Sequence, residues 1–426
     1  MRRVIIIGGG AAGMMAAIKA AENNSSVLLL EKTNHLGKKL SITGKGRCNI
    51  TNAADIPEII KNIPGNGKFL NSVLRAFDSS DVIIFFESIG VKTKIERGRR
   101  VFPLSDNAHE VVNALINKMT ELGVEIRTNT RVTDILVKAG RVIGVEVGNK
   151  AGNKFENADA VILTTGGASY PATGSTGDGF KIAQKLGHTV TEILPALVPL
   201  ETEENFVKDL QGLSLRNVKV TLLSDDKRIA DEFGEMLFTH FGVSGPVILT
   251  LSRKAAFLLN EGKTVELSIN LKPALTPEQL EARVLRDFEK FKRKSIKNAL
   301  IDLLPSSLIP VVIDLSYINE DKHIDSVTQI ERRRLISVLR DLRLTIIKTR
   351  PIEEAIVTAG GVSVKEINPK TMESKLIKNL FFAGEVVDID GFTGGFNLQA
   401  AFSMGNAAGK AITNEELRMK NEEYFP

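Results

Sequence analysis

The clearest apolar pattern in the chain is a pair of short, fully apolar runs separated by a helical segment. Val4 to Ile7 is a run of β-branched residues, which is typical of a strand buried on both faces of a parallel sheet. Ala11 to Glu22 follows as an alanine-rich helical segment, and Val27 to Leu30 is a second apolar run. The pattern predicts a strand, a helix and a second, parallel strand, which together form one βαβ unit.

Glycines separate the first predicted strand from the helix, with the spacing Gly8-x-Gly10-x-x-Gly13. Between a strand and a helix, this spacing indicates a dinucleotide site, because glycine lets the backbone approach a pyrophosphate. The helix N-terminus adds free N–H groups and partial positive charge. Glu31 closes the second strand, where its carboxylate is placed to accept hydrogen bonds from a ribose hydroxyl.

Further strand patterns follow in the first half of the chain. A third strand is predicted at 124–127, and a buried strand at 160–163 ends in glycines. Between them, the segments with alternating apolar and polar residues are 131–138, 141–147 and 154–156. Turns containing glycine separate these segments, which predicts an antiparallel meander.

The pattern changes near Pro195 and Pro199. Val218–Leu222 and Val265–Leu271 alternate apolar and polar residues, as half-solvated strands do. The segments with helical character in this region are 277–291, 296–304 and 326–342. Buried-strand patterns return from Leu344 onward, which indicates that the first domain resumes there.

These patterns predict an α/β protein with a Rossmann-like dinucleotide-binding domain that carries a β-meander. The domain is predicted to be discontinuous, formed by residues 1–194 and 345–426. Residues 195–344 are predicted to form an inserted α+β substrate or cap domain, with antiparallel strands and helices.

A second motif lies near the C-terminal end of the sequence. The segment 383–388 ends a strand with small and acidic residues, and the glycine-rich segment 391–401 opens a helix. Glu385 and Asp388 can accept hydrogen bonds from a ribityl hydroxyl or bind waters on the phosphate side. A helix N-terminus close to a flat ring would stabilise the negative charge that a reduced flavin carries near N1.

Composition narrows the class of protein. The chain has 426 residues, 43% hydrophobic and 25% charged, as expected for a soluble protein of two or three domains. The sequence has no apolar span of 18 residues, so we expect no transmembrane helix. The single cysteine, Cys48, excludes an internal disulfide and fits a reducing cytoplasm. Five histidines without metal-ligand spacing predict no metal site.

The net charge of +5 favours an anionic ligand such as FAD or NADPH and does not demand nucleic acid. The densest basic runs, 292–294 and 332–334, are interpreted as solvated helix faces. A second glycine cluster, 174–179, follows a loop and is interpreted as a turn and helix cap. A dedicated nicotinamide domain is therefore not expected, and NAD(P)H would dock transiently at the flavin or an external donor would serve.

Several longer motifs resemble those of the YhiN/BaiN-like family of FAD-containing oxidoreductases, which share the glutathione-reductase-type FAD domain. Besides the first glycine loop with Glu31, they are TGKGRCNITN at 43–52, TTGGASYPATGSTGDG at 164–179, LFTHFGVSGP at 237–246, TAGG at 358–361 and FFAGEVVDIDGFTGGFNLQAA at 381–401. The resemblance covers essentially the whole chain. It implies one FAD held by a domain built from both termini, and an inserted domain that closes over the flavin.

The resemblance also implies individual roles. Val132 would contact the adenine through its backbone, and Phe396 stands where the family suggests a tyrosine, so ring stacking would survive without a hydroxyl hydrogen bond. The predicted cofactor-binding residues are Gly8, Gly10, Ala12, Gly13, Glu31, Lys32, Lys39, Thr43, Gly44, Gly46, Arg47, Cys48, Asn49, Val132, Thr165, Gly166, Gly384, Glu385, Asp388, Gly394, Gly395, Phe396 and Asn397.

Three side chains are candidates for further roles. His240, in the predicted inserted domain, is a candidate proton donor, because its ordinary pKa suits proton transfer near neutrality; the alternative is a loop hydrogen bond. Cys48 is interpreted as a buried spacer beside the flavin, and as the only cysteine it excludes a dithiol relay. Arg47 is interpreted as holding the FAD pyrophosphate, with an anionic substrate or NADPH phosphate as the alternative.

Two functions are consistent with these features. The favoured one is an NAD(P)H-linked, FAD-dependent oxidoreductase in the cytoplasm, which transfers hydride through the flavin N5 to an unidentified small organic substrate. The family's name derives from the reduction of a conjugated double bond in a steroid. A conjugated double bond is therefore one option for the reduced bond, but the steroid itself is not taken over as the substrate of this chain. The alternative is a flavoprotein that binds RNA or a protein partner, as tRNA-modifying relatives of this FAD fold do. We expect a small-molecule substrate, no membrane association and no nucleic acid.

Overall fold

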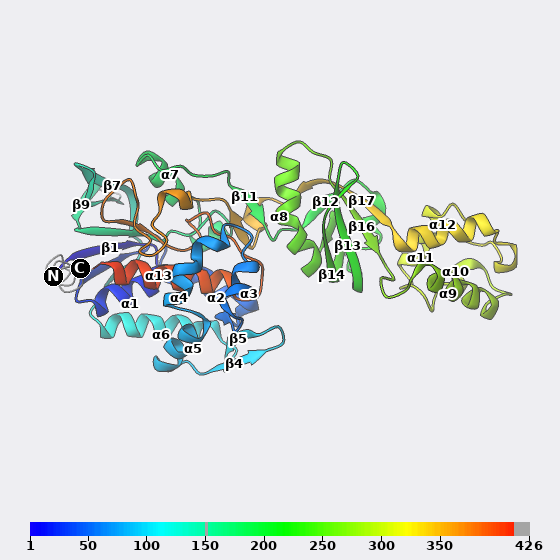
Figure 1. Cartoon of the computed structure of the whole chain (residues 1–426), viewed down its shortest axis with the longest axis horizontal. Helices are drawn as coiled ribbons and strands as arrows, with labels where there is room; N and C mark the ends of the chain where they lie inside the picture. Colours follow the sequence, from blue (N-terminus) through cyan, green and yellow to red (C-terminus); the bar gives the residue numbers. More distant parts are fainter. Residues whose placement is uncertain (150–151, 413–426) are drawn as a thin grey trace. The chain divides into compact units, whose positions relative to one another are not determined.

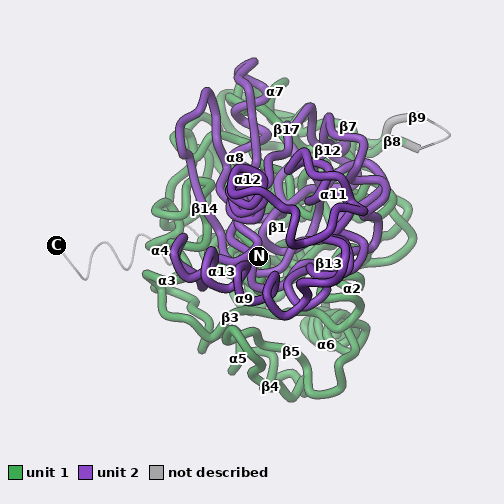
Figure 2. Tube along the Cα trace, turned by 90° about the vertical axis from the view of Figure 1, so that its right-hand side faces the viewer, with its two compact units in different colours: residues 1–194, 356–426 green, residues 195–355 purple. Residues whose placement is uncertain are grey.

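The computed structural model describes residues 1–149 and 152–412, which divide into two compact units (Figure 2). Unit 1 combines residues 1–194 with those from 356 onward, and unit 2 comprises residues 195–355. The chain passes between them at β11 (Leu194–Ala196) and just before β18 (Val357–Ala359).

A parallel sheet forms the centre of unit 1. Its strands, in spatial order, are β19 (Leu380–Phe382), β10 (Ala160–Leu163), β1 (Arg3–Ile7), β2 (Ser26–Leu30) and β6 (Glu125–Arg127). Val4, Ile5 and Ile6 are fully buried, as a run of β-branched residues between two covered faces requires. The predicted Rossmann-like sheet is confirmed, and its edge strand β19 comes from the distant C-terminal segment.

Two helices that are far apart in sequence pack against each other beside this sheet. α1 (Ala11–Glu22) and α13 (Phe396–Ala411) lie side by side in Figure 1 and share one of the closest interfaces in the chain. Glycines make the approach possible: a Cβ on Gly405 would lie 2.4 Å from the Ala12 carbonyl oxygen, and one on Gly409 would lie 2.6 Å from that of Ala16. The side-chain amide of Asn23 also donates to the carbonyl of Lys410 at 3.0 Å.

The other elements of unit 1 surround this centre. The further helices are α2 (Lys38–Gly46), α3 (Ile56–Lys61), α4 (Asn71–Ala76), α5 (Ser79–Ser88), α6 (Ala108–Glu121) and α7 (Asp178–Lys185). The predicted antiparallel meander is formed by β7 (Arg131–Lys138), β8 (Arg141–Asn149) and β9 (Gly152–Asn157). A small antiparallel sheet has the order β3 (Thr51–Asn52), β5 (Arg100–Pro103) and β4 (Thr93–Glu96).

Unit 2 is built on a closed antiparallel barrel. Its strands, in spatial order, are β12 (Leu200–Thr202), β15 (Gly242–Ser244), β14 (Lys227–Thr239), β13 (Ser214–Ser224), β16 (Glu266–Asn270) and β17 (Leu342–Thr349). Its helices are α8 (Pro246–Asn260), α9 (Pro277–Lys290), α10 (Ile296–Ala299), α11 (Leu308–Leu315) and α12 (Gln329–Arg340). The predicted mixture of antiparallel strands and helices is confirmed.

The second border of unit 2 differs from the predicted one. The predicted border between residues 344 and 345 falls inside β17, which pairs with both β12 and β16 and closes the barrel. The apolar residues Leu344 and Ile346 therefore face the barrel core and do not mark a return to the parallel sheet. A buried strand of either unit gives the same apolar pattern, which explains the difference.

The close contact of α1 and α13 gives a stability prediction. Gly409→Ala should lower the free energy of unfolding by about 1–3 kcal/mol, because the added methyl group overpacks a helix contact. Helix propensity alone predicts the opposite sign, a gain of about 1 kcal/mol. Urea unfolding of the two proteins measures the difference.

The neighbouring change Lys410→Ala serves as a control, because Lys410 is exposed on the same helix. It should alter the free energy of unfolding by no more than about 0.5 kcal/mol. A Gly409→Ala protein as stable as its parent would show that the helices can separate without loss.

Candidate active site

Unit 1 contains a cavity of about 1070 Å³, large enough for a dinucleotide. All of its lining residues belong to unit 1. They come from the carboxyl ends of β1, β2 and β10, from α2, and from the N-terminal ends of α1 and α13. Ligands in open α/β sheets bind at this edge.

Each of the three glycines in the first loop is needed for a different structural reason. Gly8 has a φ of +106°, and a Cβ there would lie 2.6 Å from the carbonyl oxygen of Thr164. A Cβ on Gly13 would lie 1.9 Å from the Gly8 carbonyl oxygen, so Gly13 permits the contact of helix and strand. A Cβ on Gly10 would meet no atom within 4 Å. Gly10 therefore leaves open space in front of α1, as a bound pyrophosphate would need.

The N-termini of α1 and α13, which line the cavity, lack a side-chain cap. Gly10 is the N-cap of α1 and Gly395 that of α13, and neither helix has an acidic residue in its first turn. By contrast, α5, α9 and α12 all begin with a capping box. The uncapped N–H groups and partial positive charges of α1 and α13 are thus left for an anionic or electron-rich ligand.

Glu31 lies beside the glycine loop, as predicted. One carboxylate oxygen accepts from the Gly9 backbone N–H at 2.8 Å, and the other accepts from that of Thr33 at 2.7 Å. A carboxylate can accept about four hydrogen bonds, so these two leave capacity for ribose hydroxyls. The neighbouring Lys32 is instead paired with Asp178 at 2.9 Å.

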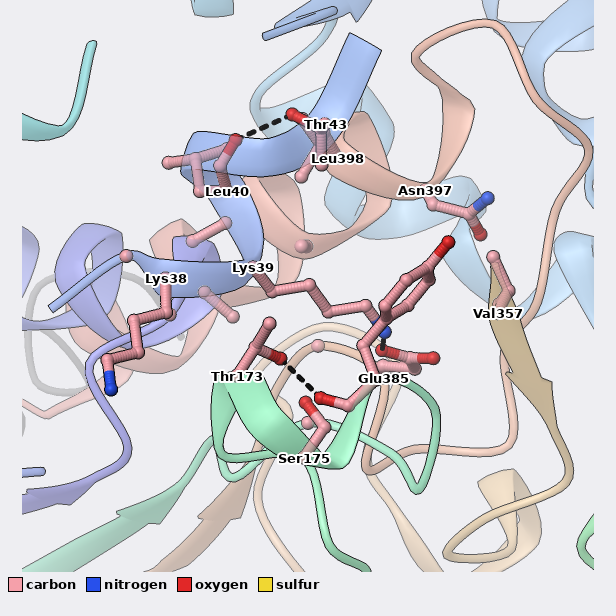
Figure 3. A pocket seen from close by; sticks show the side chains of 18 of the residues that line it. Lys38, Lys39, Leu40, Thr43, Thr173, Ser175, Val357, Glu385, Asn397 and Leu398 are labelled. Atoms are coloured by element: carbon pink, nitrogen blue, oxygen red, sulfur yellow. Dashed lines mark hydrogen bonds and ion pairs between the residues drawn. The ribbon is translucent and has the colours of Figure 1, made fainter. Parts of the chain in front are cut away.

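An ion pair between Lys39 and Glu385 crosses the cavity wall and links α2 to the C-terminal segment (Figure 3). The Nζ atom of Lys39 lies 2.7 Å from the Glu385 carboxylate and 2.6 Å from the Ser169 hydroxyl. Burial by itself would raise the pKa of Glu385. The charge and hydrogen bond of Lys39, with the Thr358 backbone N–H and the Ser169 hydroxyl, hold that pKa below its usual value.

The loop that precedes α13 is held in a fixed conformation at the cavity. The Asn397 side chain accepts from the Gly391 N–H at 2.8 Å and donates to the Gly391 carbonyl at 2.7 Å. The Asn52 amide donates to the Gly394 carbonyl at 2.9 Å. Gly395 has a φ of +97°, and a Cβ on it would lie 2.4 Å from the carbonyl of Thr51. Phe396, at the start of the helix, is 6% exposed.

Two polar atoms in the cavity wall are buried without a hydrogen-bond partner among the described residues. They are Thr165 Oγ1 and Asn49 Oδ1. Buried polar atoms are normally paired. Together with the open space at Gly10 and the two uncapped helices, they fit a polar, anionic cofactor such as FAD.

Most of the predicted cofactor-binding residues line the cavity. Those that do so are Gly8, Gly10, Ala12, Glu31, Lys32, Lys39, Thr43, Gly44, Arg47, Asn49, Val132, Thr165, Gly166, Gly384, Glu385, Gly394, Gly395, Phe396 and Asn397. Four predicted residues do not line it: Gly13, Gly46, Cys48 and Asp388. Gly13 acts through backbone packing, and Gly46 lies at the exposed end of α2.

Cys48 and Asp388 occupy other surroundings. Cys48 is fully buried, and burial raises the pKa of its thiol to about 12 although Thr43 offers a hydrogen bond. It is therefore a packed thiol and not a nucleophile. Asp388 is half-buried, and its backbone N–H donates to the Val362 carbonyl at 3.0 Å. Its position in the motif suggested a cofactor contact, but Asp388 is not among the residues that line the cavity.

Arg47 lines the cavity with its charge already matched. Its guanidinium forms ion pairs with Glu96 and, at 2.6 Å, with Asp106. The hydrogen bonds that the guanidinium donates to Glu96 and Asp106 raise the pKa of Arg47. The guanidinium also stacks over the Phe102 ring at 4.1 Å. These contacts make Arg47 a brace for the β3–β5–β4 sheet and give no support to a pyrophosphate contact.

His240 belongs to unit 2 and does not line the cavity. Its ring is exposed and lies 5.0 Å from the Phe241 ring, edge to face. The guanidinium of Arg350 lies over the same Phe241 ring at 4.7 Å. The role of His240 as proton donor therefore stays a proposal.

Several cavity residues were missed by the sequence interpretation. Asn52, Arg100 and Phe102 come from the small β3–β5–β4 sheet, and Tyr170 and Ser175 come from the loop after β10. Asn52, Tyr170 and Ser175 lie within motifs that were recognised as a whole, so single residues could have been taken from them. Arg100 and Phe102 carry no motif, and only the fold brings them to the cavity.

Neither a cluster of metal ligands nor a helix able to span a membrane occurs in the part of the chain that the structure describes. No group of three or more His, Cys, Asp or Glu side chains there could hold a metal ion. Within residues 1–149 and 152–412, no helix has both the length and the apolar character that a membrane crossing needs.

The fold and cavity define a Rossmann-type dinucleotide-binding protein. Residues 2–411 match the family model described as "HI0933-like protein Rossmann domain", and the chain belongs to this family. The resemblance to YhiN/BaiN-like oxidoreductases is thereby confirmed, and the protein is an FAD-dependent oxidoreductase of that family.

Curated relatives match the chain over most of its length. A 3-dehydro-bile acid delta(4,6)-reductase of Clostridium scindens is 34% identical over 90% of this chain and 91% of its own. Two proteins named ribosomal RNA dihydrouridine synthase are also similar. The Escherichia coli protein is 30% identical over 88% of this chain and 89% of its own, and that of Haemophilus influenzae is 28% identical over 89% and 90%.

Solved structures share the fold. A 3-ketosteroid delta1-dehydrogenase of Sterolibacterium denitrificans superimposes with a TM-score of 0.53 at 13% identity, covering 96% of this chain and 99% of its own. A quinol fumarate reductase chain of E. coli gives a TM-score of 0.50 at 16% identity, covering 100% and 74%. At these identities the similarity shows the fold alone.

The burial of Cys48 predicts low reactivity of its thiol. In the native protein at pH 8, Cys48 should react with a disulfide reagent at least tenfold more slowly than after unfolding in urea. With a pKa of about 12, almost no thiolate is present at this pH. Absorbance of the released thiol gives both rates.

Cys48→Ala should remove the reaction and leave the FAD content of the purified protein unchanged. A native thiol that reacts as fast as the unfolded one would contradict the assignment of Cys48 as a packed residue.

Proposed function

We propose that the protein reduces a carbon–carbon double bond conjugated to a carbonyl group in a small organic substrate, with NADH or NADPH as the electron donor. FAD held in this cavity would supply the chemistry of hydride transfer between donor and substrate, through its N5 position. The observation that carries the proposal is the uncapped pair of helix N-termini at one dinucleotide-sized cavity, in a chain that is 34% identical to a protein named a reductase.

The chemistry in the relatives' names supports this bond type. A 3-dehydro steroid with delta-4 and delta-6 double bonds is a dienone, in which the double bonds are conjugated to the ketone. Dihydrouridine is uridine in which the double bond conjugated to a ring carbonyl is saturated. Both reactions therefore need a hydride at the carbon distant from the carbonyl and a proton at the nearer carbon.

The residues of the cavity would divide the task of holding FAD. The loop at Gly8–Gly10 and the N-terminus of α1 would bind the pyrophosphate, and Glu31 would bind the adenosine ribose. Lys39 and Glu385 would fix the middle of the cofactor. The N-terminus of α13, held by Asn52 and Asn397, would stabilise negative charge on the reduced ring.

His240 is our proposed proton donor, on the basis of its residue type and its exposed ring. Cys48 is unsuited to this role, since its buried thiol does not line the cavity. We also propose a cytoplasmic location, which suits a chain whose one cysteine is a free thiol.

Uridine in RNA is a second candidate substrate, supported by the names of the two RNA-acting relatives. The basic run 332–334 on α12 provides limited support. Arg332 lies 3.6 Å from Glu281, and Arg334 lies over the Tyr317 ring at 5.8 Å. Arg333 lines a second cavity of about 470 Å³ in unit 2, together with Arg340 and Arg343. Arg343 is paired with Asp341 and Glu266.

Anaerobic flavin spectroscopy on the purified holoprotein tests the proposal. NADH or NADPH should bleach the flavin absorbance, and a cyclic enone should restore it faster than a matched saturated ketone, because only the enone can accept the hydride. A disulfide should not restore it, because the chain has no second cysteine for a dithiol relay.

The His240→Ala variant separates the two half-reactions. Bleaching by the donor should be unchanged, while reoxidation by the enone should slow at least tenfold, because protonation of the substrate belongs to that half alone. A flavin that NAD(P)H reduces but no enone reoxidises would contradict the proposed substrate class. RNA retained by the protein at about 0.15 M salt would favour the second candidate.

A further inference from the structure

The small β3–β5–β4 sheet forms a wall of the cavity next to the start of α13. Asn52 of β3 connects the two, because its amide donates to the Gly394 carbonyl at 2.9 Å and to the Gly98 carbonyl at 3.0 Å. Arg100 and Phe102 are two residues apart on β5, so their side chains point to the same face of this sheet. Both side chains line the cavity.

Two guanidinium groups lie over the Phe102 ring. The Arg47 guanidinium is 4.1 Å and that of Arg100 is 5.7 Å from the centre of the Phe102 ring. The ring is 3% exposed. Arg100 is further positioned by its Nε atom, which donates to the Arg97 carbonyl at 3.0 Å.

The two arginines differ in their charge partners. Arg47 and Lys94 together face the carboxylates of Glu96 and Asp106, so this group of four charges is balanced. Arg100 forms no ion pair with a residue that the structure describes. Its cross-strand neighbour is Glu96, whose carboxylate is already bound by Arg47.

The other carboxylate of this wall is also engaged. Glu58 lines the cavity and forms an ion pair with Arg99 at 2.9 Å. Lys45, which also lines the cavity, has no ion-pair partner in the described part of the chain. The wall thus carries more positive than negative charge, and Arg100 is its guanidinium without a matching carboxylate.

We propose that Arg100 determines substrate specificity by binding an oxyanion of the substrate, either a carboxylate or a phosphate. A guanidinium binds such groups through two parallel hydrogen bonds, and its planar fork is already oriented here by Phe102 and Arg97. The inference rests on the proposed function, because that proposal is what gives the protein a substrate. It narrows this substrate to molecules that carry an anionic group.

Binding to the FAD-loaded full chain tests this assignment, with charged and uncharged probes that differ in one group. The first pair is a 3-oxo-delta-4 steroid carboxylic acid and its methyl ester, and the second is uridine 5′-monophosphate and uridine. Dissociation constants come from the change in the visible spectrum of oxidised FAD. Because no turnover is needed, failure of the proposed reduction would leave this measurement readable.

The parent should bind the charged member of one pair at least tenfold more tightly than its uncharged partner. Arg100→Gln should reduce this ratio to about one, mainly by weakening the charged probe. Arg100→Lys should keep part of it, since a lysine retains the charge without the fork. FAD content and bleaching by dithionite should stay as in the parent.

The matched control is Arg99→Gln, which removes the same charge from the same hairpin at a residue that does not line the cavity. It should keep the full ratio, which separates a specific contact from general attraction. An Arg100-dependent preference within the steroid pair would identify the bound group as a carboxylate. The same preference within the uridine pair would identify it as a phosphate. No Arg100-dependent preference in either pair, equal loss for both members of a pair, or loss of FAD from Arg100→Gln would overturn the inference.

Discussion

The contact between α1 and α13 is the constraint on which the rest of unit 1 depends. Gly405 and Gly409 allow the two backbones to touch, and the contact places two helix N-termini at the carboxyl edge of one parallel sheet. Both termini lack caps and acidic residues, so their partial positive charges point to the same cavity. A ligand that is anionic at one end and gains negative charge at the other would be stabilised by both helix N-termini.

The remaining contacts of the cavity keep this arrangement in place. Lys39 and Glu385 join the N-terminal and C-terminal segments by an ion pair, and Asn52 joins the small sheet to the loop before α13. The wall that carries Phe102 is braced by Arg47 and its two carboxylates. Residues that pair with one another thus form the scaffold, while Glu31 and Arg100 keep hydrogen-bonding capacity for ligands.

The parts of the fold that depend on local pattern could be predicted from the sequence. Val4–Ile7, the first glycine loop and Glu31 lie as expected, because burial, backbone freedom and spacing act over a few residues. The barrel could not be predicted, because β12 and β15 are three residues long and both strands that pair with β12 are distant in sequence. The predicted domain border falls inside β17, because a buried strand of the barrel and a buried strand of the parallel sheet give the same apolar pattern.

Within the site, residue type was more predictable than side-chain direction. Gly13 and Cys48 belong to the right motifs, but one acts through packing and the other is buried away from the cavity. Arg47 is paired with Glu96, at the end of β4, and with Asp106, in the turn after β5, and no motif marks either residue. Which arginine keeps an unmatched charge depends on those pairings, and so only the three-dimensional structure points to Arg100.

The most direct test of the account is the FAD affinity of a Gly10→Val variant. The backbone at Gly10 has a φ of −83°, and a Cβ there meets no protein atom within 4 Å, so the apo-variant should fold and unfold like the parent apoprotein. The added side chain would occupy the space in front of α1, and the account predicts a colourless protein with at least a tenfold weaker affinity for FAD. Normal FAD occupancy in this variant would contradict the central claim that the uncapped α1 terminus holds the cofactor.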